Sequence, residues 1–169
     1  MINYQIAKKI LKKSIIKIKD EKIKSVNSLN RVASANIYSS IDYPSGNNAA
    51  FDGFAINSKD TKNINKKINQ KFKIIGSIAA GARPFKKIIK RFDAVEIMTG
   101  GIIPNGFDTI VPIEKIVFSP SIKNRKYILI NKKVDKFNHV RFKGSDYKKN
   151  EIVLKKNSII QPNHILTFK

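Results

Sequence analysis

Hydrophobic residues recur with two different periods along this chain, and the change of period separates a helical start from a β-rich remainder. Residues 4–18 place Ile6, Ile10, Leu11 and Ile15 near helical spacing, with lysines between them. This pattern predicts an amphipathic helix whose apolar stripe packs on its own domain or on a second subunit. A membrane surface or an organelle presequence are the alternatives for the same pattern.

A second, shorter helix is predicted over residues 28–35, with Ser28 as its N-cap. The period then changes, and residues 35–42 favour a strand. Residues 43–48 read Tyr-Pro-Ser-Gly-Asn-Asn, a cluster of turn-forming residues that predicts an exposed loop and a possible domain boundary.

Short β-type runs follow, separated by turns rich in Gly, Pro, Asn or Lys. The predicted strands are residues 54–56, 72–78, 94–98, 109–112, 127–130, 140–142 and 152–154. Residues 59–71 lack apolar periodicity and predict a solvated loop that includes at most a poor helix. A last helix is expected over residues 162–168, capped near Gln161.

Composition narrows the class of protein. The 169 residues are 41% hydrophobic, enough for one or two packed cores. Cysteine is absent, which excludes disulfides, cysteine-ligated metal sites and thiol catalysis, and His139 and His164 are the only histidines. No apolar run approaches the roughly 18 residues that cross a bilayer, and the start lacks a secretory pattern, so a cytoplasmic location without membrane contact is expected.

The charge is strongly positive, with 34 Lys and Arg against 12 Asp and Glu and a net charge of +22. Such a balance is typical of proteins that bind nucleic acid or anionic lipid. Here almost all the cations are lysines and they are spread over the whole chain, whereas nucleic-acid readers cluster charge and favour arginine forks. We therefore attribute the charge to biased composition and expect no specific nucleic acid, keeping a basic nucleic-acid-binding module as the weaker alternative.

Four segments combine small residues with polar groups. Asp52 stands between two aromatic residues and directly before Gly53, so it is either an exposed Asp-Gly turn or a carboxylate that needs a cation or N–H partner. Residues 98–104 contain Thr99, Gly100 and Gly101, a set of N–H and hydroxyl donors suited to an oxyanion or phosphate.

Two further segments are weaker candidates. Residues 76–84 permit close approach of backbone and carry Arg83, and residues 141–146 place Arg141 and Asp146 around Gly144, either as a site or as an ordinary ion pair. No motif of a hydrolase triad, a zinc protease or a dinucleotide-binding loop is present. The residues by themselves indicate an anion-binding, β-rich protein.

The order of these segments resembles the N-terminal half of the molybdopterin molybdenumtransferase family, which includes the E domain of gephyrin. Residues 48–55, Asn-Ala-Ala-Phe-Asp-Gly-Phe-Ala, are similar to the family's "NSAMDGYA", and residues 96–114 resemble "RIMTGAPLPEGADAVVPVE". Residues 29–37, 76–84, 141–146 and 159–165 fall on "LGRVLAEDV", "GEIAAGEAP", "RRAGED" and "LTPAHI".

The resemblance implies insertion of molybdate into adenylylated molybdopterin with Mg²⁺ and release of AMP. It implies that Asp52, Thr99 and Asp146 are catalytic, with Asp52 and Asp146 as Mg²⁺ ligands. Cofactor-binding roles fall on Gly53, Gly100, Gly101 and Arg141.

The resemblance also implies the architecture, an α+β, β-rich fold with N-terminal helices. An elongated, dimerising domain of residues 1–44 and 141–169 is expected, with a small β-barrel-like domain of residues 45–140 inserted in it. The family's pterin-binding domain does not follow residue 169, so it is expected in cis in a longer protein or as a separate chain, and a homodimer is expected.

Departures from the family pattern leave an alternative. The family has "PPFD" before Asn48, where this chain has Pro44-Ser45-Gly46-Asn47, and Ser145 replaces the glutamate of "GED". These changes remove two acids and leave partner binding or a decayed activity open. Because these residues do not include the pterin-binding domain, the 169-residue chain alone is expected to be inactive. A noncatalytic dimerisation or scaffold remnant of the family is the second hypothesis.

Overall fold

The computed structural model describes residues 2–14, 18–64, 69–83 and 85–168, and their contacts divide the chain into two compact units. The smaller unit combines Met1–Tyr38 with Ile152–Lys169, and the larger unit is Ser39–Glu151. The predicted α+β, β-rich architecture is confirmed, because short strands dominate and α-helices are few. The boundaries expected at residues 44 and 141 stay a prediction.

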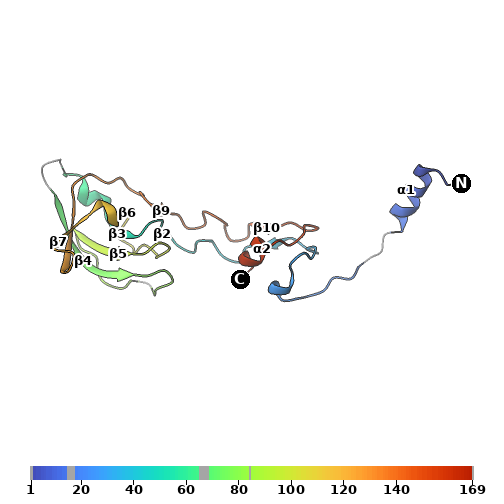
Figure 1. Cartoon of the computed structure of the whole chain (residues 1–169), viewed down its shortest axis with the longest axis horizontal. Coiled ribbons are helices and arrows are strands. Elements are labelled where there is room, and N and C mark those ends of the chain that lie inside the picture. The colour runs from blue at the N-terminus through green and yellow to red at the C-terminus, as the bar shows by residue number, and fades with distance from the viewer. Residues whose placement is uncertain (1, 15–17, 65–68, 84, 169) are drawn as a thin grey trace. The chain divides into compact units, whose positions relative to one another are not determined.

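A curled six-stranded sheet forms the body of the larger unit (Figure 1). The spatial order of its strands is β6-β3-β5-β4-β8-β7. Only β4 and β5 run parallel, and every other neighbouring pair is antiparallel. The strands are β3 (Gly53–Ile56), β4 (Gln70–Ile78), β5 (Asp93–Ile97), β6 (Thr109–Pro112), β7 (Val117–Pro120) and β8 (Arg125–Ile130), with a 3₁₀ turn η3 (Ile113–Lys115) between β6 and β7.

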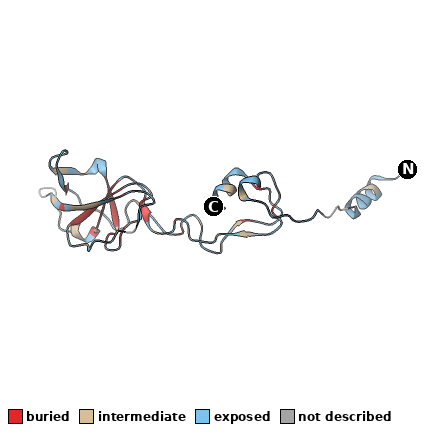
Figure 2. Ribbon diagram, turned by 90° about the horizontal axis from the view of Figure 1, so that it is seen from below, coloured by how far each residue is buried: buried red, intermediate tan, exposed pale blue. Residues whose placement is uncertain are grey.

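Strand β3 shows why these runs form a sheet with both faces covered. Its side chains alternate, so Phe54 and Ile56 enter one apolar cluster while Ala55 enters another. All of β3 is buried, and Figure 2 shows buried strands of the sheet in red. A strand buried on both faces needs a continuous apolar run, which explains why the sequence here does not alternate between polar and apolar residues.

The predicted strands of this sheet are confirmed to within a few residues. The sequence pattern missed β7, whose side chains are half-buried or exposed, and it missed β2 (Asn48–Ala49). In the segment 59–71, a 3₁₀ turn η2 (Ser58–Thr61) occupies the start, and residues 65–68 lie outside the described residues.

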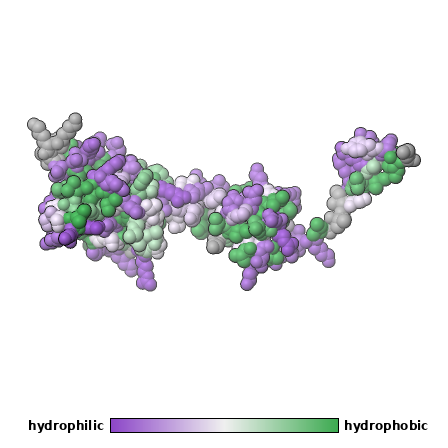
Figure 3. Space-filling model, viewed as in Figure 1, coloured by the Kyte–Doolittle hydropathy of each residue, from purple (hydrophilic) through white to green (hydrophobic). Residues whose placement is uncertain are grey.

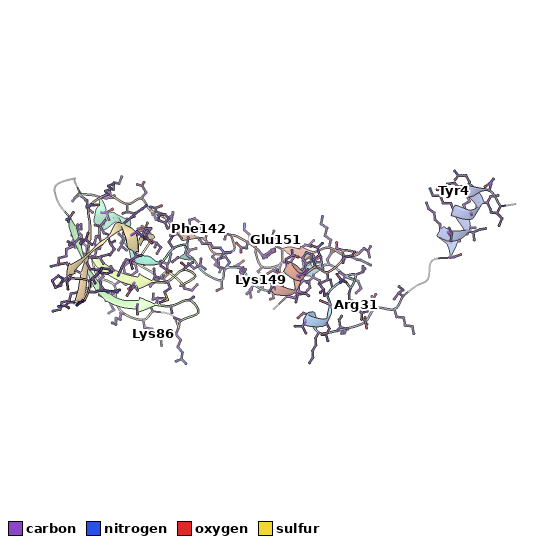
Figure 4. All side chains as sticks on the ribbon, in the orientation of Figure 1. Tyr4, Arg31, Lys86, Phe142, Lys149 and Glu151 are labelled. Carbon is purple, nitrogen blue, oxygen red and sulfur yellow. The ribbon has the colours of Figure 1, made fainter. Side chains whose placement is uncertain are left out.

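An antiparallel ribbon leads out of the sheet region within the larger unit. Strand β2 pairs with β9 (Val140–Arg141), Tyr43 bridges to Tyr147, and the Ser39 N–H donates to the Glu151 carbonyl at 2.8 Å. Phe142, Lys149 and Glu151, labelled in Figure 4, lie along the second arm of this ribbon. The predicted loop at residues 43–48 is therefore one arm of a paired ribbon.

The smaller unit is built around a two-stranded sheet and a short helix. Strand β1 (Ile37–Tyr38) pairs with β10 (Ile152–Leu154), and α2 (Pro162–Thr167) follows. The helix predicted at residues 162–168 is confirmed, with Gln161 as its N-cap. Arg31, labelled in Figure 4, pairs with Glu21 at 2.5 Å on the exposed surface.

The helix predicted over residues 28–35 is wrong. A 3₁₀ turn η1 (Ser25–Asn27) precedes this segment, and the Ser28 hydroxyl donates back to the Ser25 carbonyl at 2.6 Å. Asn30 adopts a φ of 63°, outside the helical region. Its N–H and that of Ala33 bond to the carbonyls of Ile160 and Ser158. Pairing with a distant segment therefore replaced the local helical bonds.

The N-terminal helix predicted over residues 4–18 is present as α1 (Tyr4–Lys13), and residues 15–17 lie outside the described residues. Asn3 caps it by accepting the Ile6 N–H at 2.9 Å. None of its residues is buried, and Figure 3 shows its apolar and hydrophilic sides separately. Among the described residues, no helix has the length and apolar character needed to traverse a bilayer.

Candidate functional site

The backbone around Asp52 is fixed by the start of β3. The Ile113 N–H donates to the Asp52 carbonyl at 3.1 Å. A Cβ on Gly53 would lie 2.1 Å from the Val111 carbonyl oxygen, so this position admits only glycine without moving β3 away from β6. The Asp52 side chain itself is exposed. Close strand pairing thus holds the backbone of a carboxylate that faces solvent.

Thr99 lies in a tight turn directly after β5. The Gly101 N–H donates to the Met98 carbonyl at 2.8 Å, and Gly100 has a φ of +82°, the geometry of a type II turn with glycine at its third position. Gly101 is confined as well, because a Cβ there would lie 2.8 Å from Ile97 Cγ1. The two glycines therefore fix where Thr99 presents its N–H and hydroxyl.

Asp52 and Thr99 form a direct pair. The Thr99 N–H and the Thr99 hydroxyl both donate to Asp52 Oδ1, each at 2.7 Å. The backbone N–H, and after it the hydroxyl, hold the pKa of the Asp52 carboxyl below its ordinary value. Asp52 is therefore ionised at neutral pH, and within the described part of the chain its Oδ2 accepts no hydrogen bond. Asp52 lies on an exposed bend between β2 and β3, which do not pair with each other, and it also has an N–H partner, so both alternatives given for this segment describe part of the structure.

Residues 47–49 connect the Thr99 turn with the segment that carries Arg141. On one side, the Gly100 N–H donates to the Ala49 carbonyl at 2.8 Å, and the Ala49 N–H donates to the Gly101 carbonyl at 3.0 Å. On the other side, Asn48 pairs with Arg141 in the ladder between β2 and β9. This short segment is thus the middle strand of a local three-segment arrangement.

Arg141 and Asp146 close the far end of the arrangement. Their side chains form a salt bridge, with exposed fractions of 44% and 33%, and the Ser145 hydroxyl donates to Asp146 Oδ1 at 3.3 Å. The Arg141 guanidinium also lies 5.9 Å from the centre of the Tyr43 ring. Partial exposure makes this pair a modest contributor to stability. The Arg141–Asp146 pair is connected to the Thr99 turn through the 47–49 segment, which pairs with both.

The structure thus brings the predicted site residues into one hydrogen-bonded network. The network contains Asp52, Gly53, Thr99, Gly100, Gly101, Arg141 and Asp146. Arg83 is exposed, and no contact among the described residues joins it to this network. Ala80, three residues earlier, does approach the network, because its Cβ lies 3.6 Å from the position that a Cβ on Gly100 would take.

Metal-binding chemistry in this region is limited to individual carboxylates. Among the described residues, no group of three or more His, Asp or Glu side chains could together hold a metal ion. Asp146 is neutralised by Arg141, whereas Asp52 retains an oxygen without a hydrogen bond among the described residues. A Mg²⁺ site at these residues stays a prediction, and it would need oxygens from the substrate to complete its coordination.

Sequence reasoning missed the contributions of Asn47 and His139. Asn47 Oδ1 accepts the Lys143 N–H at 2.9 Å, and its carbonyl accepts the Ile103 N–H at 2.9 Å. The His139 ring packs edge-on against Phe51 with centroids 4.8 Å apart, and its Nε2 is buried without a partner among the described residues. No sequence motif marks His139, and the sequence marks Asn47 only as a departure from the family's "PPFD", since both roles depend on which segments pair.

Comparison with known proteins gives a consistent result along nearly the whole chain. Residues 2–168 match the family model described as the MoeA N-terminal region (domain I and II). The chain is 34% identical over 138 residues to a molybdopterin molybdenumtransferase of Staphylococcus aureus (strain Mu50), which covers 82% of this chain and 32% of that protein. A molybdopterin molybdenumtransferase of Staphylococcus epidermidis (strain ATCC 35984) is 30% identical over 155 residues, covering 92% of this chain and 36% of that protein.

The fold matches as well. A crystal structure of the molybdopterin biosynthesis moeA protein from Pyrococcus horikoshii OT3 superposes with a TM-score of 0.86 at 27% identity, covering 99% of this chain and 43% of that chain. The present chain spans about a third of the length of the curated relatives it matches.

Proposed function

The chain belongs to the family of MoeA N-terminal regions, and from this membership we propose that it acts in molybdenum cofactor biosynthesis as the N-terminal part of a molybdopterin molybdenumtransferase. The proposed reaction joins molybdate to the dithiolene of adenylylated molybdopterin and releases AMP. The observation that carries the proposal is the ionised Asp52, held by two donors of Thr99 on a backbone that glycines and strand pairing keep rigid.

In this proposal Asp52 is an anion that acts on an anionic substrate. A carboxylate repels a phosphate or molybdate unless a cation lies between them. Mg²⁺, when bound, would supply that positive charge and accept hard oxygens from both sides. Asp52 Oδ2 is the oxygen this chain offers for the purpose, because Oδ1 is already engaged by Thr99.

Thr99 orients the Asp52 carboxylate. Arg141 offers a positive charge on the other side of the 47–49 segment. The hydroxyl and N–H of Thr99 fix one oxygen of Asp52 and keep the group ionised. Arg141 compensates Asp146, and its partly exposed guanidinium is also available to a substrate anion. Gly53, Gly100 and Gly101 serve this proposal by fixing the two backbones rather than by supplying side chains.

The proposal requires a pterin-binding domain in addition to these residues, supplied in cis or by a separate chain, because the chain spans about a third of its curated relatives. It also includes a homodimer and a cytoplasmic location. Exposed apolar side chains in the smaller unit support a second subunit as a partner, among them Val26, Leu29, Val32, Ile159 and Leu166. Sedimentation of the purified chain tests the dimer against the monomer mass of 19.1 kDa.

A chimera tests the activity directly. Residues 2–168 of this chain replace the matching N-terminal region of the Staphylococcus aureus relative, and the chimera is expressed in a host that lacks its own enzyme of this family. We expect the host's molybdenum enzymes to regain activity. Asp52→Asn in the chimera should lower that activity at least tenfold, because the amide has no negative charge to hold a cation.

Asp135→Asn is the matched control, since it removes the same charge from an aspartate that is 89% exposed elsewhere in the larger unit. Equal activity of the chimera with and without Asp52→Asn would overturn the catalytic role of Asp52. A folded chimera without activity would favour the noncatalytic scaffold. Sequence-specific binding of DNA or RNA at physiological salt would instead favour the basic nucleic-acid-binding module.

A further inference from the structure

Asn47 stands where the family pattern has the aspartate of "PPFD", and it holds two separate loops at once. Its carbonyl accepts the Ile103 N–H at 2.9 Å, which ties it to the segment after the Thr99 turn. Its side-chain Oδ1 accepts the Lys143 N–H at 2.9 Å, which ties it to the segment between Arg141 and Asp146.

The second contact lies where regular strand pairing stops. The ladder between β2 and β9 ends at the pair of Asn48 and Arg141, and the next backbone bond between the two arms is the one from the Gly144 N–H to the Pro44 carbonyl. The Asn47 amide oxygen takes the place of a backbone carbonyl at that point. It adds one more bond beyond the end of the ladder, to the N–H of Lys143.

The position of the 141–146 segment depends on a small number of hydrogen bonds to residues 43–47. The Gly144 N–H donates to the Pro44 carbonyl at 2.9 Å, and the Asp146 N–H donates to the Tyr43 carbonyl at 3.0 Å. Gly144 has a φ of +67°, so the chain turns sharply here and its path is set by these contacts. Asn47 adds a side-chain hydrogen bond at the Lys143 N–H, two residues after Arg141.

We infer that Asn47 is a positioning residue that fixes the Arg141–Asp146 pair relative to the Asp52–Thr99 pair. The inference rests on the proposed function for its chemical meaning, and it assigns a role to a residue that the sequence marked only as a departure from the family pattern. It also accounts for one departure from the family pattern. The amide of Asn47 keeps an acceptor where the pattern has a carboxylate, so this substitution changes the charge without removing the bond.

Three variants of the full 169-residue chain test the inference. Asn47→Leu keeps the size of the side chain and removes the acceptor, whereas Asn47→Asp keeps the acceptor. Asn36→Leu is the matched control, because Asn36 Oδ1 accepts the Lys156 N–H at 2.8 Å in the smaller unit, far along the chain from Arg141.

Amide exchange and the Arg141 guanidinium signals are then followed by NMR. Loss of one net hydrogen bond of about 1 kcal/mol should speed exchange of the Lys143 N–H about fivefold in Asn47→Leu. The restricted guanidinium signals of Arg141 should broaden in the same variant. Both should be preserved in Asn47→Asp, and Asn36→Leu should affect only Lys156. Unchanged Lys143 exchange and Arg141 signals in Asn47→Leu would overturn the inference, as would equal losses in Asn47→Asp.

The same substitutions in the chimera add the catalytic readout. We expect Asn47→Leu to lower the turnover rate at least fivefold, Asn47→Asp to restore it to within twofold, and Asn36→Leu to leave it unchanged. An Asn47→Leu chimera that matches the Asn36→Leu chimera would overturn the catalytic part. If the unsubstituted chimera is inactive, the proposed function fails, while the NMR measurements on the chain still decide whether Asn47 holds the 141–146 segment.

Discussion

The two units of this chain differ in how completely their apolar residues are covered. In the larger unit both faces of the sheet are packed, and Phe54, Phe72 and Val95 are fully buried. In the smaller unit the buried apolar cluster consists of Ala33, Leu154 and Ile160. A small core leaves little margin over the entropy lost on folding.

This difference explains where the candidate site is built. All of its residues lie in the larger unit, where β5 and β6 pair with the two edges of β3, the strand that begins directly after Asp52. A rigid scaffold allows exposed polar side chains to be placed accurately at the ends of strands. Both units expose some apolar side chains, but the smaller unit has only a small buried cluster beside them, which is the character of a surface that associates with a partner.

The largest expected effect is on the core of the larger unit. Phe54→Ala removes a fully buried ring that packs edge-on against Phe118 with centroids 5.9 Å apart. We expect a loss of about 3–5 kcal/mol in the free energy of unfolding, measured by urea denaturation. Phe51→Ala is the control, because that ring is 52% exposed and should cost clearly less. Equal losses would mean that burial does not set the difference.

A smaller loss is expected in the smaller unit. Leu154→Ala should cost about 2–3 kcal/mol, because Leu154 is 5% exposed in a cluster that contains few other apolar groups. Hydrogen exchange should show the N–H groups of Asn30 and Ala33 losing protection while β3 and β5 keep theirs. Loss of protection in both units together would show that the two units unfold as one.

A pH effect is expected in the larger unit. Burial, and after it the charge of Lys115, lower the pKa of His139 below its ordinary value of 6.5. The unfolded chain then binds this proton more readily, so stability falls as the pH drops below 6.5 and stops falling below the folded-state pKa. Denaturation of the chain between pH 7.5 and 5 should show this slope, and His139→Phe should abolish it. A slope that persists in the variant would place its origin elsewhere.

The smallest effect is expected in the N-terminal helix. Ile10→Ala should change the free energy of unfolding by no more than about 0.5 kcal/mol, because Ile10 is 50% exposed and α1 contains no buried residue. Ile160→Ala, at 6% exposure, is the contrasting change. Urea denaturation of the isolated subunit measures both, and a loss above 1 kcal/mol in Ile10→Ala would show that α1 packs on the rest of the subunit.

Prediction from the sequence succeeded where the signal is local. The strands around Phe54, Phe72 and Val95 follow from runs of apolar residues bounded by turn formers, and the last helix follows from Gln161 and Pro162. It failed at residues 28–35, where Ser28 imitates a helix cap while the N–H groups of Asn30 and Ala33 bond to a segment more than a hundred residues away. Local patterns carry no information about such partners.

For the candidate site, too, the sequence determined some features and the tertiary structure decided the others. The sequence determined the chemical groups: a carboxylate before Gly53, a hydroxyl before two glycines, and a cation and a carboxylate around Gly144. It also determined the family, because these groups occur in a characteristic order. Only the tertiary structure decided that Thr99 donates twice to Asp52, that Asn48 pairs with Arg141, and that Asn47 takes over where the ladder ends. The physical reason is that hydrogen bonds between distant segments depend on strand register, which is set by the packing of the whole sheet.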